Sequence, residues 1–508
     1  MNWFDDSALS LAVFIPLVGM ALVLVIPKAQ EQAIKLTTLI TAVVTLGVGI
    51  GILAEFDYGK ANHLQFNVNE PWISVIHSRY HMGIDGISLP LLILSMLITL
   101  MCVIYSWNHF PEPYNPKAFL ALVLLLEVGM NGTFVAQDLI LFFIFFEIVL
   151  LPMFFVIGVW GGPNREYASI KFFLFTLFGS ALMLVGFLAI FFLAPKQTFD
   201  IQTLANFAGH GISRGTQTLI FTGLFLGFAI KVPMFPFHTW LPDAHTEAPT
   251  VGSVLLAAIL LKLGAYGFIR IALPILPKGA QVWAPWLGLL AVIGIIYGAL
   301  GCLAQRDLKR LIAFSSVAHM GFVMLGIATL TNFGINAAIF GMVAHGLITG
   351  MLFFLAGSVQ ERYGTRELSR LGGLLTQAPH LGWILAFCAM ASLGLPGLAG
   401  FWGEFPAILS SYRPHGFDSQ LWVFRTYMVI AAIGKVLAAG YLLWMLQRVA
   451  FGKVRTEFEA LHVHDVHGPE WIAWVPLLVL IVALGIYPNI IFHATNDAVT
   501  GLAKVFGG

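Results

Sequence analysis

Long apolar runs, interrupted at fairly regular intervals by short polar joints, fill the chain. The joints carry proline, glycine, asparagine and charged residues, which are typical of turns. A helix needs about 20 apolar residues to cross the hydrocarbon core of a bilayer. The chain contains fourteen such runs, centred near residues 18, 43, 96, 127, 148, 181, 229, 262, 292, 320, 345, 395, 435 and 481. The pattern predicts an all-α polytopic membrane protein with about 14 transmembrane helices.

The composition agrees with this prediction. Of the 508 residues, 59% are hydrophobic and 10% are charged, and the net charge of +1 argues against a nucleic-acid partner. Residues 1–7, MNWFDDS, are acidic rather than basic, so we expect a retained first span and no cleaved signal peptide. Cys102, Cys302 and Cys388 stand singly in apolar runs without a CxxC spacing, and we expect them to be packing residues.

Lysine and arginine are shared unevenly between the two sets of loops. With the N-terminus placed outside, the inner loops hold fourteen of these residues and the outer segments hold nine. Positive charge favours the cytoplasmic side of a membrane. We therefore expect both termini to face outward, with interface anchoring as the ordinary role of these charges.

Ionisable residues also fall near the centres of the apolar runs. A charge at the middle of a bilayer costs at least ~3 kcal/mol, so such residues normally face a polar interior and mark ion or proton paths. A polar contact between helices would explain any one of them, but acids, bases and imidazoles together favour a proton-conducting chain. The residues concerned are Glu127, Glu147, Lys231, Lys262, His319, His345 and Lys435.

The segment LFLGFAIKVPMFPFHTWLPDAH, residues 224–245, starts as an apolar helix and then contains a lysine and two prolines. Pro233 and Pro236 remove backbone donors, so we expect the helix to open just after Lys231. Open backbone at mid-depth requires a cavity or protein contacts around it. A carboxylate about 4 Å away would attract the ammonium by about 4 kcal/mol. Moving an acid such as Glu147 would then switch Lys231 between holding and releasing a proton.

A second interrupted helix is predicted at ASLGLPGLAGFWGEF, residues 391–405, where glycines and a proline precede Glu404. Close packing of small residues is the alternative explanation. Two broken helices at matching places are typical of inverted repeats. Five spans within 117–273 would then match five within 281–448. The predicted domains are residues 1–115 (three helices), 116–275 and 276–455 (five-helix repeats), and 456–508 (a C-terminal helix and tail).

Two polar segments could be mistaken for metal sites. PFHTWLPDAHTEAPT contains His238, Asp243, His245 and Glu247, but their spacing matches no zinc or iron motif and suits a turn before a new helix. HVHDVHGPE, residues 462–470, is a weaker candidate. We expect no metal and no bound cofactor on this chain.

Several long motifs resemble one family, the M-type subunits of bacterial NADH:quinone oxidoreductase, respiratory complex I. The motifs are GIDGIS, FFEIVLLPMFF, FAIKVPMFPFHTWLPDAHTEAPTVGSVLLAAILLKLGAYG, DLKRLIAFSSVAHMGF, MVAHGLITGMLFFLAGSV and GLPGLAGFWGEF, which span residues from about 80 to 450. The resemblance implies fourteen helices with two inverted five-helix repeats that contain two discontinuous helices. It also implies a proton-translocating membrane subunit.

The resemblance implies roles for individual residues as well. Glu147 and Lys231 match the acid–lysine pair, Lys262 the bridging lysine, and Glu404 the terminal acid. The histidines of the buried axis match His319, His345 and, after the first break, His238. Glu127 is a further candidate. Lys435 departs from the family pattern, and an extra axis residue and a lysine reaching to the interface remain equal alternatives.

The same resemblance implies location and partners. We expect a bacterial inner-membrane protein beside L-type and N-type subunits, with NADH, FMN, Fe–S clusters and quinone bound by partner subunits. L and N subunits usually carry lysine at the place of Glu404, which favours M. A subunit of a sodium/proton antiporter or membrane-bound hydrogenase is the related alternative. The remaining alternatives are an inert scaffold and a b-type haem carrier with His319 and His345 as axial ligands.

Overall fold

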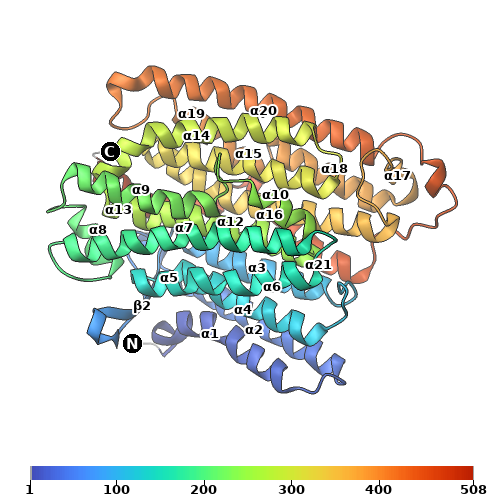
Figure 1. Ribbon diagram of the computed structural model, residues 1–508, viewed down its shortest axis with the longest axis horizontal. Coiled ribbons are helices and arrows are strands. Elements are labelled where there is room, and N and C mark those ends of the chain that lie inside the picture. Colours follow the sequence, from blue (N-terminus) through green and yellow to red (C-terminus); the bar gives the residue numbers. More distant parts are fainter. Residues whose placement is uncertain (1–2, 507–508) are drawn as a thin grey trace.

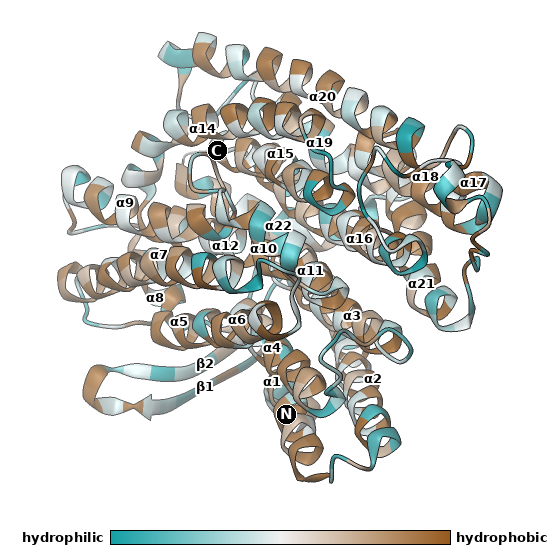
Figure 2. Ribbon diagram, turned by 45° about the vertical axis from the view of Figure 1, so that its right-hand side comes forward, coloured by the Kyte–Doolittle hydropathy of each residue, from teal (hydrophilic) through white to brown (hydrophobic). Residues whose placement is uncertain are grey.

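Membrane-type helices make up most of the computed structural model, which describes residues 3–506. Within the described residues, 11 helices are long and apolar enough to cross a membrane. They lie side by side, with α1 and α2 at one edge and α20 at the opposite edge (Figure 1). Hydrophobic residues cover the outer helices, while hydrophilic residues gather in connecting segments such as that around α17 (Figure 2). The predicted all-α polytopic fold is confirmed.

Helix length and composition support 11 of the fourteen predicted spans. The other three runs, near residues 96, 229 and 395, form shorter helices, in which α3 has 17 residues, α9 has 18 and α18 has 15.

The N-terminal part consists of α1 (Trp3–Val25), α2 (Glu31–Glu55), β1 (Gln65–Ile73), β2 (Ser78–Ile84) and α3 (Leu89–Tyr105).

The middle of the chain holds the first group of helices. Its members are α4 (Pro116–Val135), α5 (Leu139–Ile148), α6 (Leu150–Trp160), α7 (Arg165–Leu193), α8 (Ile201–Phe207), α9 (Arg214–Lys231), α10 (Trp240–Glu247), α11 (Thr250–Leu255), α12 (Leu261–Gly267) and α13 (Leu273–Ile275). Two π-helical segments, η3 (Leu256–Leu260) and η4 (Phe268–Ala272), join α11 to α12 and α12 to α13.

The second group follows without a linker domain. It contains α14 (Pro277–Leu303), α15 (Leu308–Ala328), α16 (Asn332–Tyr363), α17 (Leu374–Gln377), α18 (Pro379–Leu393), α19 (Ala399–Ser410) and α20 (Leu421–Val449), and it precedes α21 (Gly468–Ile486) and α22 (Asn489–Ala503). The two predicted breaks are confirmed, since α9 ends at Lys231 before α10, and α18 ends at Leu393 before α19.

Burial separates a central set of helices from a peripheral set. The apolar windows of α16, α15 and Thr250–Ile275 are 94–100% buried, whereas those of α1, α2, α7 and α20 are 33–39% buried. A helix that is apolar all round belongs in the interior of a membrane protein. The ionisable residues near the middle of these helices, Lys262, His319 and His345, therefore lie away from lipid.

A β-hairpin, which the hydropathy pattern did not predict, interrupts the N-terminal helices. Strands β1 and β2 pair antiparallel, and His81 of β2 contacts Asp200 at 2.5 Å. Burial alone would raise the pKa of Asp200, but hydrogen bonds from His81 and Thr203 outweigh burial and lower that pKa. The hairpin is thus tied to the loop before α8.

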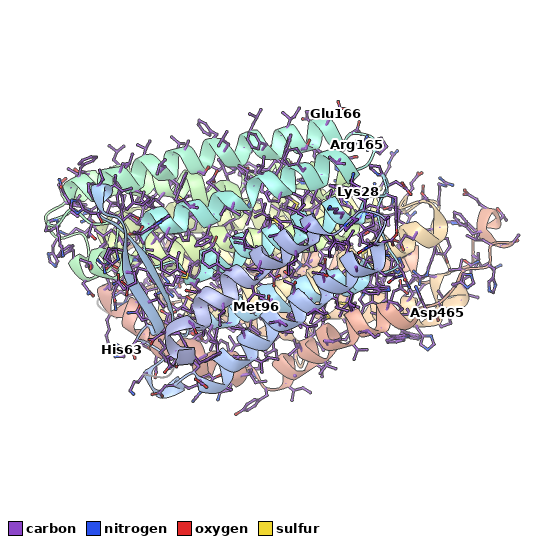
Figure 3. All side chains as sticks on the ribbon, turned by 90° about the horizontal axis from the view of Figure 1, so that it is seen from below. Lys28, His63, Met96, Arg165, Glu166 and Asp465 are labelled. Carbon is purple, nitrogen blue, oxygen red and sulfur yellow. The ribbon has the colours of Figure 1, made fainter. Side chains whose placement is uncertain are left out.

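Two ion pairs join helix ends that are distant in sequence. Arg270 binds Asp85 through both guanidinium nitrogens, at 2.8 and 2.5 Å, which ties GIDGIS to the Lys262 helix. Arg362 of α16 binds Glu470 of α21 in the same way, at 2.9 and 2.7 Å. Figure 3 places Arg165 and Asp465 toward one end of the helices and His63 at the other.

Replacing Arg270 with Met should destabilise the fold, because Asp85 would remain buried without its cation. Breaking a buried pair in this way costs about 3–5 kcal/mol. The melting temperature of the purified complex should fall clearly. Lys60→Met is the matched control, since Lys60 pairs with Asp57 on the surface with 72% and 50% of the side chains exposed. Equal melting temperatures for both variants would contradict the anchoring role of Asp85 and Arg270.

Candidate functional site

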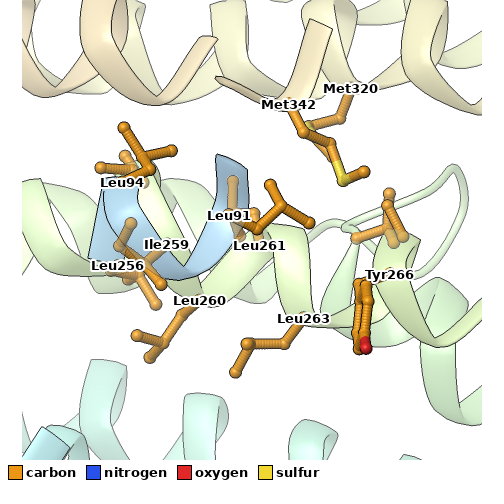
Figure 4. Packing of buried hydrophobic residues seen from close by; sticks show 14 of the residues in the cluster. Leu91, Leu94, Leu256, Ile259, Leu260, Leu261, Leu263, Tyr266, Met320 and Met342 are labelled. Atoms are coloured by element: carbon orange, nitrogen blue, oxygen red, sulfur yellow. The ribbon is translucent and has the colours of Figure 1, made fainter. Parts of the chain in front are cut away.

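Lys262 lies on α12, which is flanked by two π-helical segments, and its side chain is fully buried. Figure 4 shows its sequence neighbours Leu261 and Leu263 in the buried apolar cluster that also contains leucines of α3, Met320 and Met342. The Lys262 ammonium donates to the Ala257 carbonyl at 2.6 Å. Ala257 belongs to η3, and π-helical turns widen the backbone and often mark functional sites. The wide turn thus supplies an acceptor for a buried charge.

The same ammonium contacts the second half of the chain. Lys262 Nζ lies 2.6 Å from Nδ1 of His345 on α16. An ammonium has only donors, so His345 Nδ1 accepts and the ring proton is on Nε2. His345 Nε2 is buried, with no hydrogen-bond partner among the described residues. Lys262 and His345 therefore form a direct link between the two predicted repeats.

A small cavity is lined by both His345 and the next histidine, His319. The cavity measures about 20 Å³, and His319, His345, Thr349, Ser392 and Glu404 contribute to its lining. The ring centroids of His319 and His345 are 5.9 Å apart. A cavity of this size holds about one water molecule when polar groups surround it. One water would complete the hydrogen-bonded route between the two rings.

His319 contacts an acid on one side and hydroxyls on the other. Its Nδ1 donates to Glu404 Oε1, and its Nε2 lies 3.0 Å from Ser392 Oγ and 3.1 Å from Tyr441 Oη. A hydroxyl can donate or accept. His319 can therefore be neutral or protonated without losing a hydrogen bond.

Glu404 is shared between two bases. Its second oxygen, Oε2, accepts a hydrogen bond from the Lys435 ammonium. The ammonium also lies 3.5 Å from the Ser392 carbonyl and 5.7 Å from the centroid of the Phe322 ring. The Lys435 ammonium therefore points to Glu404 at mid-depth and does not extend to the membrane interface.

The second helix break makes room for this contact. Gly394 ends α18 with φ +77°, and the bonds Gly394 N–Ala391 O and Leu395 N–Met390 O form a Schellman motif. A Cβ added at Gly394 would lie 2.8 Å from Lys435 Nζ. The Lys435 ammonium therefore occupies the space that a side chain at position 394 would need.

Small residues also bring α19 close to α16, as the packing alternative requires. A Cβ on Gly403 would lie 2.4 Å from the Gly341 Cα. The close approach allows Glu404 to reach His319 across the break. Close packing of small residues and the buried Glu404 therefore coexist in this segment.

The first break positions Lys231 at the end of α9. Trp240 of α10 donates its indole N–H to the freed carbonyl of Ile230 at 2.9 Å. The Lys231 ammonium is buried and lies 4.9 Å from the centroid of the Phe146 ring. Lys231 and Glu147 attract each other electrostatically, but no ion pair within 4.0 Å joins them in the part of the chain described. This pair is in a separated arrangement.

Two predicted candidates lie outside this connected set. His238 packs among aromatic rings, with its centroid 5.7 Å from Phe235 and 4.8 Å from Tyr297, and its Nδ1 has no partner among the described residues. Glu127 of α4 is fully buried, and both of its oxygens are likewise unpaired within the described chain. Within the described residues, neither side chain forms a hydrogen bond or ion pair with Lys262, His319 or Glu404.

A larger polar cavity of about 340 Å³ lies at the end of the helices where α15 begins. It is lined by His109, Glu247, Lys309, Glu361 and Arg366, among others. The Lys309 side chain is buried and donates to the Ala248 carbonyl. Between this cavity and Lys262 lies His245, which stacks on Phe353 and interacts electrostatically with Lys309 and Lys262. Lys309 is one of the inner-loop cations expected to anchor the chain at the membrane interface, and its place in this buried group was not predicted.

The haem alternative does not fit the site. The two imidazoles of His319 and His345 are already bound to Glu404, Ser392, Tyr441 and Lys262. The cavity of about 20 Å³ between them is far too small for a porphyrin.

One group of side chains could approach a metal ion. The ligand atoms of His109, His467 and Glu470 lie within 4.8 Å of one another. Glu470, however, already binds the Arg362 guanidinium through both oxygens, and this positive charge opposes a metal cation. The group is better explained as a clamp between α16 and α21.

Sequence comparison identifies close relatives over the full length. The family profile "NADH:quinone oxidoreductase/Mrp antiporter, TM" matches residues 136–434, and "NADH-ubiquinone oxidoreductase chain 4, amino terminus" matches residues 11–133. NADH-quinone oxidoreductase subunit M of Rickettsia prowazekii (strain Madrid E) is 39% identical over 501 residues, which cover 98% of this chain and 99% of that one. Subunit M of Rhodobacter capsulatus is 39% identical over 513 residues, covering 98% and 97%.

Solved structures share the fold. A chain of respiratory complex I from Thermus thermophilus with bound NADH superposes with a TM-score of 0.87 at 29% identity, covering 98% of this chain and 100% of that one. A chain of the Mrp complex from Dietzia sp. DQ12-45-1b gives a TM-score of 0.83 at 19% identity and 99% coverage of both chains. The second likeness concerns the fold alone.

Gly394→Ala should destabilise the protein more than Gly397→Ala. Both glycines have positive φ, +77° and +94°, so both variants carry the same backbone penalty of about 1–2 kcal/mol. Only at Gly394 would the new Cβ displace the Lys435 ammonium, because nothing lies within 4 Å of a Cβ at Gly397. Melting temperatures of the purified complex measure the difference, and adding Lys435→Met to both variants should reduce it. Equal melting temperatures in the native background would refute the role of Gly394 as space for Lys435.

Proposed function

The chain belongs to the subunit M family of NADH-quinone oxidoreductase, and from this premise we propose that its ionisable residues near the middle of the membrane helices, from Glu147 to Glu404, carry the protons. It is a proton-translocating membrane subunit of respiratory complex I. The observation that carries the proposal is the set of direct contacts Lys262–His345 and His319–Glu404 at the buried centre. Within complex I, we assign this subunit to proton translocation and NADH oxidation to the partner subunits.

Glu147 and Lys231 act as the switch in the first half. A separated pair favours release of the lysine proton, because burial penalises the ammonium when no carboxylate is close. Approach of Glu147 would favour the ammonium again by about 4 kcal/mol at ~4 Å. The motion of α5 relative to α9 therefore controls when Lys231 holds a proton.

Lys262 then passes the proton to the second half. Its ammonium donates to His345 Nδ1, and His345 carries its ring proton on the cavity side. A water in the cavity of about 20 Å³ can accept that proton and hand it to His319. His319 delivers a proton to Glu404, the terminal acid. His238 and Glu127 support this route less directly, since they lie outside the contacts described above.

The polar cavity of about 340 Å³ provides water access from one side. Lys309 lines this cavity, and the buried His245 interacts electrostatically with both Lys309 and Lys262. These two residues lead from the cavity to Lys262. Proton intake at this end suits the predicted cytoplasmic side. Lys28 and Arg165, two of the predicted inner-loop cations, lie near this end of the helices in Figure 3. Both termini would then face the periplasm.

Neighbouring subunits of complex I are the partners of this chain. We propose L-type and N-type subunits on opposite edges of the bundle, in a bacterial inner membrane. The partner subunits would contact the exposed apolar faces of α1, α2, α7 and α20, which lie at the periphery of the bundle. NADH, FMN, Fe–S clusters and quinone are assigned to other subunits of the complex.

Glu147→Gln and Lys231→Ala should each nearly abolish proton pumping while the complex still assembles. Loss of a proton-transfer group costs about 100-fold or more in rate. Formation of a pH gradient in NADH-energised vesicles measures the effect, and Glu166→Gln, at an exposed position in the first turn of α7, is the control. Parent-level gradients in either variant, at equal subunit content, would rule out the switch.

Glu404→Gln should strongly lower pumping, since glutamine keeps the size of the side chain but cannot titrate. Glu404→Asp should retain part of the rate because it keeps a carboxylate. Initial rates of proton uptake per assembled complex distinguish the two variants, with exposed Glu459→Gln as the control. If Glu404→Gln pumps like the parent, the break at α18 and α19 serves packing alone.

A further inference from the structure

Lys435 occupies an unusual position for a lysine in a membrane helix. It lies at the midpoint of α20, far from both ends of that helix. Its ammonium contacts Glu404 and the Ser392 carbonyl, so the charge stays at mid-depth. Placing a lysine there is costly. The contact with Glu404 offsets that cost, and its geometry suggests a role beyond neutralising one acid.

We propose that Lys435 is the proton-releasing member of a terminal acid–lysine pair with Glu404. The proposal rests on the proposed function of the axis and extends the axis by one residue, onto α20. Lys435 would receive no proton directly from His319, because His319 contacts the other carboxylate oxygen, Oε1. Glu404 therefore stands between the two bases.

The proton balance of this pair is simple. In the resting state Glu404 is a carboxylate and Lys435 an ammonium. Protonated His319 transfers its Nδ1 proton to Glu404, which becomes neutral, and His319 becomes neutral as well. Lys435 then loses the attraction of the carboxylate and releases one proton to water. Transfer of the proton from Glu404 to Lys435 restores the resting state, so that one proton enters and one leaves.

The exposed fraction of the side chains increases along this relay. The side chain of Lys435 is 23% exposed, compared with 10% for Glu404 and 5% for His319. Its helix neighbours Ile433 and Val436 point outward, with 53% and 71% exposed. Lys435 is thus the outermost group of the His319–Glu404–Lys435 series. The series ends at the edge of the bundle that α20 forms (Figure 1).

The surroundings of Lys435 contain the groups that this relay needs. Glu404 of α19 contacts its ammonium, and His319 of α15 interacts with it electrostatically. Gly394 leaves the space in which the ammonium lies. In the predicted correspondence of the two repeats, α20 takes the place of the Lys262 helix, so that each half has one lysine in its fifth member. The second half would then contain its own acid–lysine pair, as the first half does with Glu147 and Lys231.

Two substitutions separate proton release from charge neutralisation. Lys435→Arg keeps a positive charge beside Glu404, but an arginine side chain does not lose its proton in proteins. Lys435→Met keeps an unbranched side chain that is one atom shorter and removes the charge. Both variants should lose most proton pumping in NADH-energised vesicles that contain the whole complex, normalised to subunit content. Val436→Met on the same helix is the control and should pump like the parent.

An infrared measurement provides an independent readout. In Lys435→Met, Glu404 loses the cation that keeps it ionised, so the spectrum should gain a band of a protonated carboxyl group. The band should be absent from the double variant Lys435→Met, Glu404→Gln. A band of equal size in the double variant would show that another acid responds, and would overturn the pairing.

Comparison with Glu147→Gln separates this inference from the proposed function. Lost pumping in Glu147→Gln combined with parent-level pumping in Lys435→Arg would overturn proton release by Lys435 and leave the axis intact. Parent-level pumping in both would overturn the proposed function itself. Loss in Glu147→Gln, Lys435→Arg and Lys435→Met is the result that the proposal predicts.

Discussion

The cost of burying charge inside a membrane protein governs the structure around the axis. Lys262 is fully buried, and at least ~3 kcal/mol must be offset for each such charge. The Ala257 carbonyl, made available in a π-helical turn, and His345 provide that offset. The same requirement explains the helix breaks, because each break gives a buried lysine either space or polar partners. The helices around them are arranged so that these contacts lie in the most buried part of the bundle.

The two halves meet this requirement differently. In the first half, Lys231 lies near the Phe146 ring and is separated from Glu147. In the second half, Glu404 is in direct contact with both His319 and Lys435. A separated pair and a closed pair in one molecule are the two states that an electrostatic relay would alternate between. The small cavity between His319 and His345 lies where the closed second half meets the bridging lysine.

The sequence predicted most of the membrane topology, because apolar run length and proline or glycine breaks are local signals. It also predicted Lys231, Lys262, His319 and His345 as buried, since their depth follows from their place in each run. The β-hairpin was missed, because β1 contains Pro71 and its residues do not alternate cleanly. The contacts of Ser392, Tyr441 and Lys309 were missed for a different reason. They depend on which helices touch, and no local pattern encodes that arrangement. The two inverted repeats stay a prediction.

In the proposed route, every proton that crosses from the first half to the second passes Lys262. The most direct test is the initial rate of proton uptake, per assembled complex, in NADH-energised vesicles that carry Lys262→Met. Uptake should fall to background while the amount of assembled complex stays at the parent level. Uptake at the parent rate would show that protons bypass Lys262 and would contradict the proposed route.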